Sequence, residues 1–278
     1  NGVIGLIATN TLAQGDTREV GLDRLVSDGF TIIRAVRSRS WPAKSANLEY
    51  AAVWGTTAKI ADAIARVCDD EPVSVISTLL EPEGRVSGQL ARLTENVGIA
   101  FQGCIVLGKG FVLQPEEARA WIDEEPRNAE VLFPYLNGED LNSRPDGSPS
   151  RWVIDMGERS QEEAERYAIP WQHLDAAVKP ERIAKDGNKY PRMVHEWWKF
   201  WNPRPAMRKA LADVHECLAI ARVSKTVMPV RVPISGVPSE QLVVFATDSF
   251  VDQAVLSSSV NQLWAVTHAS TLGTGVRY

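Results

Sequence analysis

Two apolar segments on either side of Trp41-Pro42 constrain the fold of this chain most strongly. Residues 30–37 and 47–54 are rich in β-branched and aromatic side chains, and a short polar stretch separates them. This pattern is typical of two strands joined by a loop. A continuous apolar run at residues 3–8 predicts a further strand, buried on both faces of a sheet. The first 80 residues therefore predict the end of an α/β sheet that finishes with an antiparallel strand.

Helices are expected between and after these strands. Residues 16–29 predict a short helix in which Asp16 is the N-cap and Gly29 ends the helix. Its expected apolar stripe consists of Leu22, Leu25 and Val26. Residues 59–67 predict a second helix and residues 73–79 a further strand.

The rest of the chain divides by composition into two parts. Residues 81–177 are rich in glycine, proline and short apolar segments, which predicts a mixed, β-rich domain with tight turns. Residues 178–278 begin with a basic helical segment and predict a helical and mixed support region. Trp197, Trp198 and Trp201 have helical spacing, which core packing explains better than a binding role. The elements expected here are helices at residues 115–122, 207–220 and 252–267 and strands at residues 151–154, 227–232 and 241–246.

The composition is that of a globular protein, with 44% hydrophobic and 23% charged residues. The sequence has neither an apolar run long enough to span a membrane nor a secretory signal. It enters an apolar strand directly, without an initiator Met, so we expect a piece of a longer polypeptide. Cys68, Cys104 and Cys217 are far apart, and the four histidines lack ligand spacing. This argues against disulfides and metal sites and favours a reducing cytoplasm, with the thiols as small buried apolar residues.

The net charge of −5 hides a strong asymmetry along the chain. Residues 178–225 carry 11 Lys/Arg against 5 Asp/Glu, whereas residues 111–165 carry 5 Arg against 14 Asp/Glu. A basic face on an acidic protein can still follow the phosphates of a nucleic acid, because the local field matters more than the total charge. A solvated helix surface with salt bridges explains the same charges equally well.

Trp41-Pro42 is the candidate functional feature of the predicted hairpin. An aromatic side chain at such a loop suits an enzyme that stacks on a base extruded from DNA, because stacking returns part of the cost of extrusion. The alternative is an ordinary aromatic residue that covers the sheet edge at the end of a hairpin. Taken alone, the hairpin favours that alternative, and the rest of the chain shifts the balance.

Longer motifs extend over nearly the whole chain. The stretch Ile7-Ala-Thr-Asn-Thr-Leu-Ala-Gln-Gly-Asp-Thr-Arg-Glu19 and the stretch Ser40-Trp-Pro-Ala-Lys-Ser-Ala46, followed by an apolar strand, resemble DNA adenine methyltransferases of the MmeI-like group. These enzymes occur in type II restriction–modification systems and related phage-defence methylases. Residues 108–113, 134–146 and 150–154 resemble the target-recognition region of that group. Further similarity lies at residues 178–182, 196–198, 204–205, 222–225, 269–272 and 277–278.

The resemblance implies roles for particular residues. Trp41-Pro42 matches the aromatic–proline pair that the hairpin of these enzymes offers to a flipped adenine. Asn10 and Gln14 fall at the C-terminal end of the preceding strand, at the border of the base or cofactor pocket. The implied cofactor is S-adenosyl-L-methionine and the implied partner is double-stranded DNA. The group's glycine-rich cofactor loop and its Asn-Pro-Pro-aromatic motif are absent from this sequence, so we expect the cofactor site to lie mostly outside it.

DNA contacts are expected from exposed basic residues. The candidates near DNA in the recognition domain are Lys109, Arg144 and Arg151, and those for phosphate contact are Lys179, Arg182, Lys185 and Lys225. The alternative for each is a surface charge paired with a nearby acid, as Arg144 with Asp140 or Asp146.

The sequence thus leads to the hypothesis of the C-terminal part of an adenine-specific DNA methyltransferase. In it, residues 1–80 finish the catalytic domain, residues 81–177 recognise the target, and residues 178–278 support the clamp on DNA. The expected fold class is α/β and α+β, with the tail of a Rossmann-like sheet followed by a mixed β-rich domain. Two other functions stay open: a non-catalytic DNA-binding specificity subunit that works with a separate catalytic chain, and an interaction domain without affinity for DNA.

Overall fold

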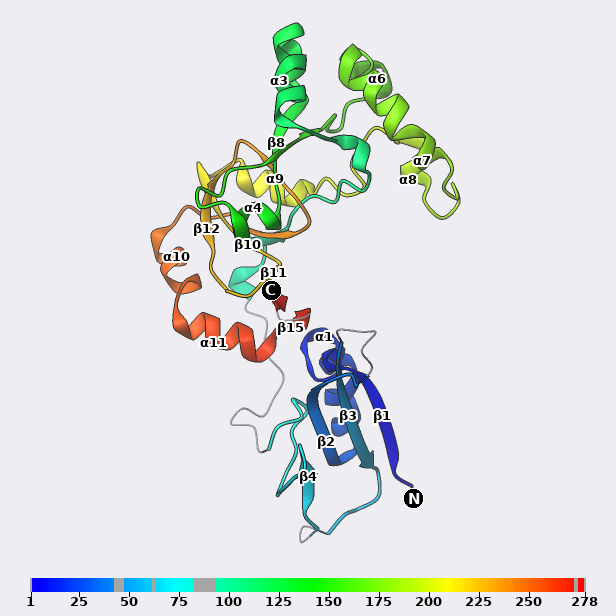
Figure 1. Ribbon diagram of the computed structural model, residues 1–278, viewed down its shortest axis with the longest axis vertical. Helices are drawn as coiled ribbons and strands as arrows, with labels where there is room; N and C mark the ends of the chain where they lie inside the picture. Colours follow the sequence, from blue (N-terminus) through cyan, green and yellow to red (C-terminus); the bar gives the residue numbers. More distant parts are fainter. Residues whose placement is uncertain (1, 43–47, 62–63, 83–93, 273–274, 278) are drawn as a thin grey trace. The chain divides into compact units, whose positions relative to one another are not determined.

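The computed structural model describes residues 2–42, 48–61, 64–82, 94–272 and 275–277. The chain divides into two compact units (Figure 1). The hairpin unit comprises residues 1–93 and 259–278, and the two-sheet unit comprises residues 94–258. The domain boundaries expected at 80/81 and 177/178 do not coincide with these units.

A five-stranded sheet forms the hairpin unit. Its strands lie in the order β1-β3-β2-β4-β5. β2 and β4 run parallel, and the other neighbouring strands run antiparallel. The predicted antiparallel hairpin and the mixed α/β character are therefore confirmed. The strands are β1 (Ile4–Thr9), β2 (Thr31–Ser40), β3 (Glu49–Thr56), β4 (Arg66–Cys68) and β5 (Glu71–Val73).

The segment after β3 differs from the prediction. The helix expected at residues 59–67 is wrong for its described part, because residues 66–68 form β4. The backbone of Cys68 pairs with Ala35 of β2, and both side chains are buried in the core of the unit. The strand expected at residues 73–79 is reduced to β5. Pairing with a distant strand here overrides the local helical pattern.

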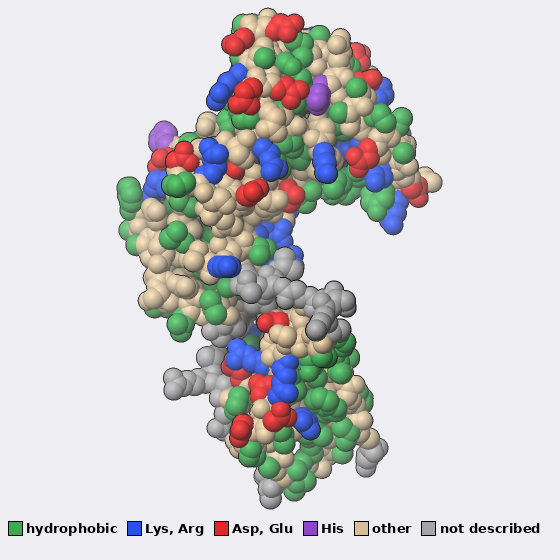
Figure 2. All heavy atoms as spheres, in the orientation of Figure 1, with side chains coloured by type: hydrophobic (Ala, Val, Ile, Leu, Met, Phe, Trp, Pro, Cys, Tyr) green, Lys and Arg blue, Asp and Glu red, His purple; other side chains and the backbone are tan. Residues whose placement is uncertain are grey.

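β1 is exposed, although its apolar sequence predicts burial on both faces. Ile4 and Ile7 are 67% and 58% exposed, and Leu6 is exposed as well. Among the described residues, β1 pairs only with β3, so its other edge is uncovered. Figure 2 shows hydrophobic side chains gathered along the side of this unit where Figure 1 draws β1.

The segment between β1 and β2 is helical, as predicted, but its start differs. It consists of a 3-10 turn, η1 (Asn10–Ala13), followed by α1 (Gly15–Arg18), the π-helix η2 (Glu19–Asp23) and α2 (Arg24–Ser27). Gln14, rather than Asp16, is the N-cap of α1. Gly29 follows the last turn with a φ of 93°, a conformation that suits glycine and ends the helix where expected.

The π turn changes which side chains reach the core. A π turn places one more residue in a turn than an α-helix does, and so it rotates the residues that follow. Leu22 is therefore buried, whereas Leu25 and Val26 of the predicted stripe are exposed. The core of the unit consists of Leu12, Ala13, Leu22, Ile32, Ala35, Ala51, Val53, Cys68, Ile76 and Leu80. The unit also contains α11 (Ser259–His268), β15 (Ser270–Leu272) and β16 (Gly275–Arg277).

Two four-stranded sheets form the two-sheet unit. The first has the order β12-β10-β14-β6 and is antiparallel throughout. The second has the order β13-β8-β9-β7, in which only β13 and β8 run parallel. The strands are β6 (Ala100–Gln102), β7 (Val112–Leu113), β8 (Leu132–Leu136), β9 (Arg151–Ile154), β10 (Glu216–Ala221), β12 (Val230–Pro233), β13 (Val237–Pro238) and β14 (Leu242–Phe245), and a short strand, β11, covers Val223–Ser224.

Each of these sheets joins strands from both sides of the expected boundary at 177/178. β6 pairs with β14 and β8 pairs with β13, so residues 94–258 share one core. The helices around this core are α3 (Pro115–Glu124), α4 (Gly138–Ser143), α5 (Gln161–Ala164), α6 (Ala168–Ala177), α7 (Lys179–Ile183), α8 (Pro191–His195), α9 (Pro205–Leu211) and α10 (Phe250–Leu256), and the 3-10 turns are η3 (Thr94–Asn96), η4 (Lys109–Phe111) and η5 (Pro126–Glu130).

The element predictions for this unit are confirmed in part. The helix at 115–122 and the strand at 151–154 are present. The helix expected at 207–220 ends at Leu211, and residues 216–221 form the buried strand β10. The helix expected at 252–267 is divided between α10 and α11. In the part of the chain that the structure describes, no helix has the length and apolarity needed to cross a membrane.

The expectation for cysteine packing is confirmed, and that for the tryptophans is confirmed for Trp197 and Trp198, whereas Trp201 is only partly buried. Cys68, Cys104 and Cys217 are buried free thiols. Trp197 and Trp198 are only 5% and 6% exposed and belong to the core of the two-sheet unit. They follow α8 in a turn rather than in a continuous helix.

Candidate nucleic-acid interface

The hairpin of β2 and β3 presents Trp41 at its tip. The backbone N–H of Trp41 donates to the carbonyl of Leu48, with 2.7 Å between nitrogen and oxygen, which closes the described end of the hairpin. The indole is 41% exposed. Its ring meets the ring of Tyr50 edge-on, with 5.4 Å between centroids and 87° between planes. Tyr50 therefore packs against the indole, and the exposed part of Trp41 is available to a ligand.

A carboxylate ties together three strand ends beside this tip. Oε2 of Glu49 accepts hydrogen bonds from Nδ2 of Asn10 at 3.0 Å and from Oγ of Ser38 at 2.8 Å. A register shift between Val36 and Arg39 places an extra residue in β2, and such a bulge redirects the side chains that follow it. The structure thus brings Asn10 to the hairpin end, and its expected place at the border of a base or cofactor pocket stays a prediction. Gln14 lies one turn further on, as the N-cap of α1.

Three arginines of β2 lead toward Trp41, and each has an acidic partner. Arg34 and Arg39 both bind the carboxylate of Asp70, and Arg37 binds Glu81 at 2.5 Å. The hydrogen bond from Arg39 lowers the pKa of the Asp70 carboxyl below its usual value. Sequence reasoning did not find Ser38, Glu49, Tyr50 or these arginines. Only Tyr50 had a usable signal, as an aromatic residue near Trp41 on the neighbouring strand of the hairpin.

In the two-sheet unit, one of the predicted DNA contacts lines a groove of about 290 Å³. Arg144 lines it together with Asn142 of α4 and with Ser224, Thr226 and Met228 after β10. Asn142 and Ser224 are joined through their side-chain oxygens at 2.9 Å.

The basic residues at and near this groove differ in their partners. Nε and Nη2 of Arg144 donate to Oγ of Ser148 at 3.0 and 2.9 Å, and Asp146 lies 4.0 Å away. Arg151, at the start of β9, lies 3.6 Å from Glu139, the residue after Gly138 in α4. Lys225 is exposed, next to Ser224. Arg144 and Arg151 are each 45% exposed, so both can exchange their carboxylates for a phosphate.

A second group of predicted contacts lies around η4 and α7. Gly110 of η4 packs against Ala177 and Val178, where a Cβ atom would come within 2.8 Å of both side chains. This close approach brings η4, which contains Lys109, beside the start of α7, where Lys179 lies. Lys109 and Lys185 are exposed, and Lys179 pairs with Asp175 and lies 5.1 Å from the centre of the Trp197 ring.

Arg182 does not fit its predicted role as a phosphate contact. It is only 2% exposed. Its Nη1 donates to the carbonyl of Lys199 at 2.9 Å, and its Nη2 donates to the carbonyls of Val106 and Leu107 at 2.8 Å each. Burial lowers the pKa of Arg182 to about 10, which still leaves the side chain charged at neutral pH. Its charge is used to bind backbone carbonyls that are distant in sequence, so no phosphate can reach it.

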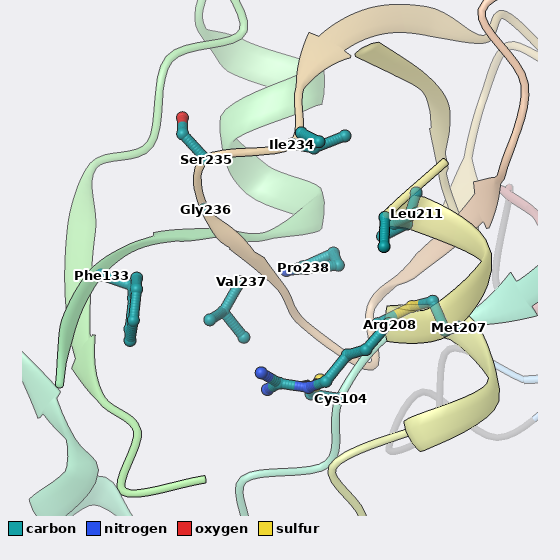
Figure 3. Close-up of a pocket in the computed structure, with 11 residues that line it drawn as sticks. Cys104, Phe133, Met207, Arg208, Leu211, Ile234, Ser235, Gly236, Val237 and Pro238 are labelled. Atoms are coloured by element: carbon teal, nitrogen blue, oxygen red, sulfur yellow. Dashed lines mark hydrogen bonds between the residues drawn. The ribbon is translucent and has the colours of Figure 1, made fainter. Parts of the chain in front are cut away.

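A second pocket, of about 280 Å³, lies between α9 and the segment from β12 to β13 (Figure 3). Figure 3 shows the Arg208 guanidinium beside Cys104 at one side of it. Arg208 binds the buried Asp155 at 2.6 Å. Burial raises the pKa of the Cys104 thiol, which donates to the carbonyl of Pro203. A protonated, hydrogen-bonded thiol is a poor nucleophile, so this pocket has no evident catalytic group.

The residues at the hairpin end do not form a recognisable site for S-adenosylmethionine. After β1 the chain turns at once into η1, whose Leu12 and Ala13 are buried in the core, so no open glycine loop follows the strand. Within the described ranges, no group of three or more His, Cys, Asp or Glu residues is placed to bind a metal ion.

The fold thus consists of a mixed α/β hairpin unit and a unit of two packed sheets with surrounding helices. No protein-family model and no curated protein matches the chain. Among solved structures, it is similar to the type IIL restriction–modification enzyme MmeI in complex with DNA, with a TM-score of 0.75 and 17% sequence identity over 99% of this chain. The chain spans 37% of the length of that protein. At this level of identity the similarity concerns the fold, and the predicted MmeI-like architecture is confirmed.

Proposed function

We propose that this chain recognises and holds DNA for an adenine-specific DNA methyltransferase of a restriction–modification or phage-defence system. The observation that carries the proposal is the exposed Trp41 at the tip of the β2–β3 hairpin. It lies within a fold that is similar to MmeI over 99% of this chain. That protein was solved in complex with DNA. In this role Trp41 stacks on the extruded adenine, and the contact with Tyr50 fixes the orientation of the indole.

The two-sheet unit supplies the clamp on the duplex in this proposal. Arg144 lines the groove beside α4, Arg151 pairs with Glu139 of α4, and Lys225 follows Ser224 of the groove lining. Lys109, Lys179 and Lys185 lie around η4 and α7. Their side chains are exposed or half-exposed, which is the condition for contact with phosphates or base edges. Because burial removes Arg182 from this set, six of the seven predicted cationic contacts remain.

S-adenosylmethionine supplies the methyl group in such enzymes. The described residues of this chain do not form its site, so we assign no step of the transfer to them. β1 is an exposed, apolar edge strand, and such strands are prone to pair with another segment. In this proposal, further strands of a catalytic sheet pair with β1.

The experiment that tests the proposal uses the complete gene product in a host without other adenine methylation. Genomic sequencing that detects modified adenines is expected to find methyl marks confined to one short motif. An unmarked genome, with the protein expressed and folded, would argue against the methyltransferase role.

Replacement of Trp41 by alanine tests the stacking role directly. In the complete enzyme, Trp41→Ala is expected to slow methyl transfer about tenfold or more, because stacking on a base is worth about 1–3 kcal/mol. Binding to an unmodified duplex should change much less. Trp41→Phe is the matched control and should retain most of the activity. Equal losses of binding and transfer, or no loss of either, would remove Trp41 from this role.

A second candidate function is a DNA-binding specificity subunit whose catalytic partner is a separate chain. The exposed edge of β1 is equally suited to pairing with a strand of another polypeptide. The two functions differ in the reading frame before Asn1: a cofactor loop and an Asn-Pro-Pro-aromatic motif in that frame would exclude the separate subunit.

A further inference from the structure

Arg39 shares the face of the hairpin that carries Trp41. Arg39 lies opposite Tyr50 in the β2–β3 register, and the ring of Tyr50 meets the indole of Trp41. Alternate residues of a strand point to the same face, and their Cα atoms are roughly 6–7 Å apart. A base stacked on Trp41 therefore has its own sugar–phosphate backbone within reach of the Arg39 side chain, which is 46% exposed.

The position of Asp70 is built by an unusual turn. Asp69 and Asp70 form the two-residue turn between β4 and β5, and their φ angles are +48° and +71°. Positive φ at both positions of a hairpin turn favours asparagine and glycine, so aspartate at both is uncommon. Both carboxylates face β2: Asp69 accepts from the backbone N–H of Arg37 at 3.0 Å, and Asp70 binds Arg34 and Arg39. Exposed ion pairs contribute little to stability, so stability alone does not explain this arrangement.

Two guanidinium groups share the one carboxylate, but they are not equivalent. Arg34 is also held by Trp54, whose ring centre lies 5.4 Å from the Arg34 guanidinium carbon. Arg39 has no ring contact among the described residues, and it lies two positions before Trp41. Arg39 can therefore leave the carboxylate while Arg34 keeps Asp70 paired. A guanidinium binds a phosphate through two parallel N–H groups, the same geometry with which it binds a carboxylate.

We propose that Arg39 binds a backbone phosphate next to the extruded nucleotide, and that Asp70 holds its guanidinium in readiness for that phosphate. The inference rests on the proposed function and assigns to the hairpin a phosphate contact in addition to base stacking. Arg39 moves from the carboxylate to the phosphate as the base is placed on Trp41, and Arg34 then neutralises Asp70 alone.

The test uses the complete gene product and a duplex that contains the motif found by methylation mapping. Binding is measured by fluorescence anisotropy over a series of salt concentrations. Arg39→Gln is expected to weaken binding about tenfold and to reduce the slope of log K against log salt by about one, the value for one lost phosphate contact. Arg37→Gln is the matched control, because it removes the same charge from the same strand while its partner is Glu81 rather than Asp70, and its slope should stay that of the unaltered protein.

A second measurement locates the phosphate. Single phosphates around the target adenine are replaced one at a time by neutral methylphosphonates. The unaltered protein should lose affinity at one position beside the adenine, and Arg39→Gln should lose nothing further there. Equal slopes for both arginine variants, or additive losses at every phosphate, would overturn the inference. If the unaltered protein does not bind the duplex at low salt, the proposed function fails first, and that outcome is distinct from a failure of Arg39 alone.

Discussion

The arginines of β2 and the basic stretch at residues 178–225 carry the same kind of charge in opposite surroundings. In β2, Arg34 and Arg39 are about half-exposed and face a carboxylate at the surface. In the basic stretch, Arg182 is buried among backbone carbonyls, Arg208 binds the buried Asp155, and Lys199 binds Glu196. The stretch with the larger charge excess thus has fewer cations available to a ligand than its sequence suggests.

This comparison shows why charge counts along a sequence are a weak guide to nucleic-acid binding. A guanidinium group has five N–H donors, which makes it suited to a phosphate and equally suited to several carbonyl groups in a core. Which of the two it binds depends on whether the surrounding fold leaves the group in water. Figure 2 is consistent with this conclusion, because the basic side chains on the face in view are interspersed with acidic ones.

The largest expected effect is a loss of stability when the buried Arg182 is replaced. Arg182→Ala should destabilise the protein by about 3–5 kcal/mol, because it removes the donors to two buried carbonyl groups and one partly buried one and opens a cavity. Urea denaturation followed by tryptophan fluorescence measures this loss. Lys185→Ala, three residues away and exposed, is the control and should be neutral.

The salt dependence of DNA binding by Arg182→Ala completes the test. Any Arg182→Ala protein that remains folded at low temperature should keep the salt dependence of DNA binding of the unaltered protein. A stable Arg182→Ala protein with a reduced salt slope would contradict the assignment of Arg182 to the protein core, because it would place Arg182 at a phosphate.

The next largest effect is on stability and separates Asp155, the buried partner of Arg208, from Asp70, the exposed partner of Arg34 and Arg39. Asp155 is 3% exposed and lies 2.6 Å from Arg208, so Asp155→Ala should cost about 3 kcal/mol by leaving a partly buried guanidinium without its charge partner. Asp70→Asn, which suits the left-handed conformation of this residue, should leave the denaturation midpoint unchanged, because the ion pairs of Asp70 are in water. A loss of stability in Asp70→Asn similar to that in Asp155→Ala would show that the surface arginines are structural too.

The smallest effect concerns the lysines that remain exposed in the basic stretch. The double variant Lys179→Gln and Lys185→Gln should reduce the salt slope of DNA binding by up to about two, without a change in stability. The double variant Glu116→Gln and Glu117→Gln in α3, at one exposed and one partly exposed acid, serves as the control for a general effect of surface charge. An unchanged slope in the lysine variant would assign both lysines to the solvated surface.

Much of the local structure follows from the sequence. The alternation on both sides of Trp41 predicts the hairpin, proline and acids at its start predict α3, and Gly29 marks the end of the first helical segment. The failures are of two kinds. Residues 66–68 and 216–221 form strands where a helix is expected, because distant strands pair with them. A π turn after Arg18 shifts Leu25 and Val26 out of the core, and no local pattern indicates it.

Of the residues at the hairpin end, the sequence indicates Trp41 but not its neighbours. The structure places Trp41 there and adds Asn10, and the role of both in a base pocket stays a prediction. The carboxylate of Glu49 that joins Asn10 to Ser38 depends on the register of β2 and β3 and on the bulge in β2. A shift of one residue in that register would turn Glu49 to the other face.

The sequence by itself determined the short-range features of this protein: the hairpin, its aromatic tip, the helix ends and the unpaired cysteines. Only the tertiary structure decided which charges are available. Arg182 is withdrawn from solvent by the carbonyls of Val106 and Leu107, more than 70 residues away, whereas Arg39 stays at the surface with Asp70. The physical reason is that burial is a property of contacts between distant segments, and a charged side chain binds whichever partner those contacts bring within reach.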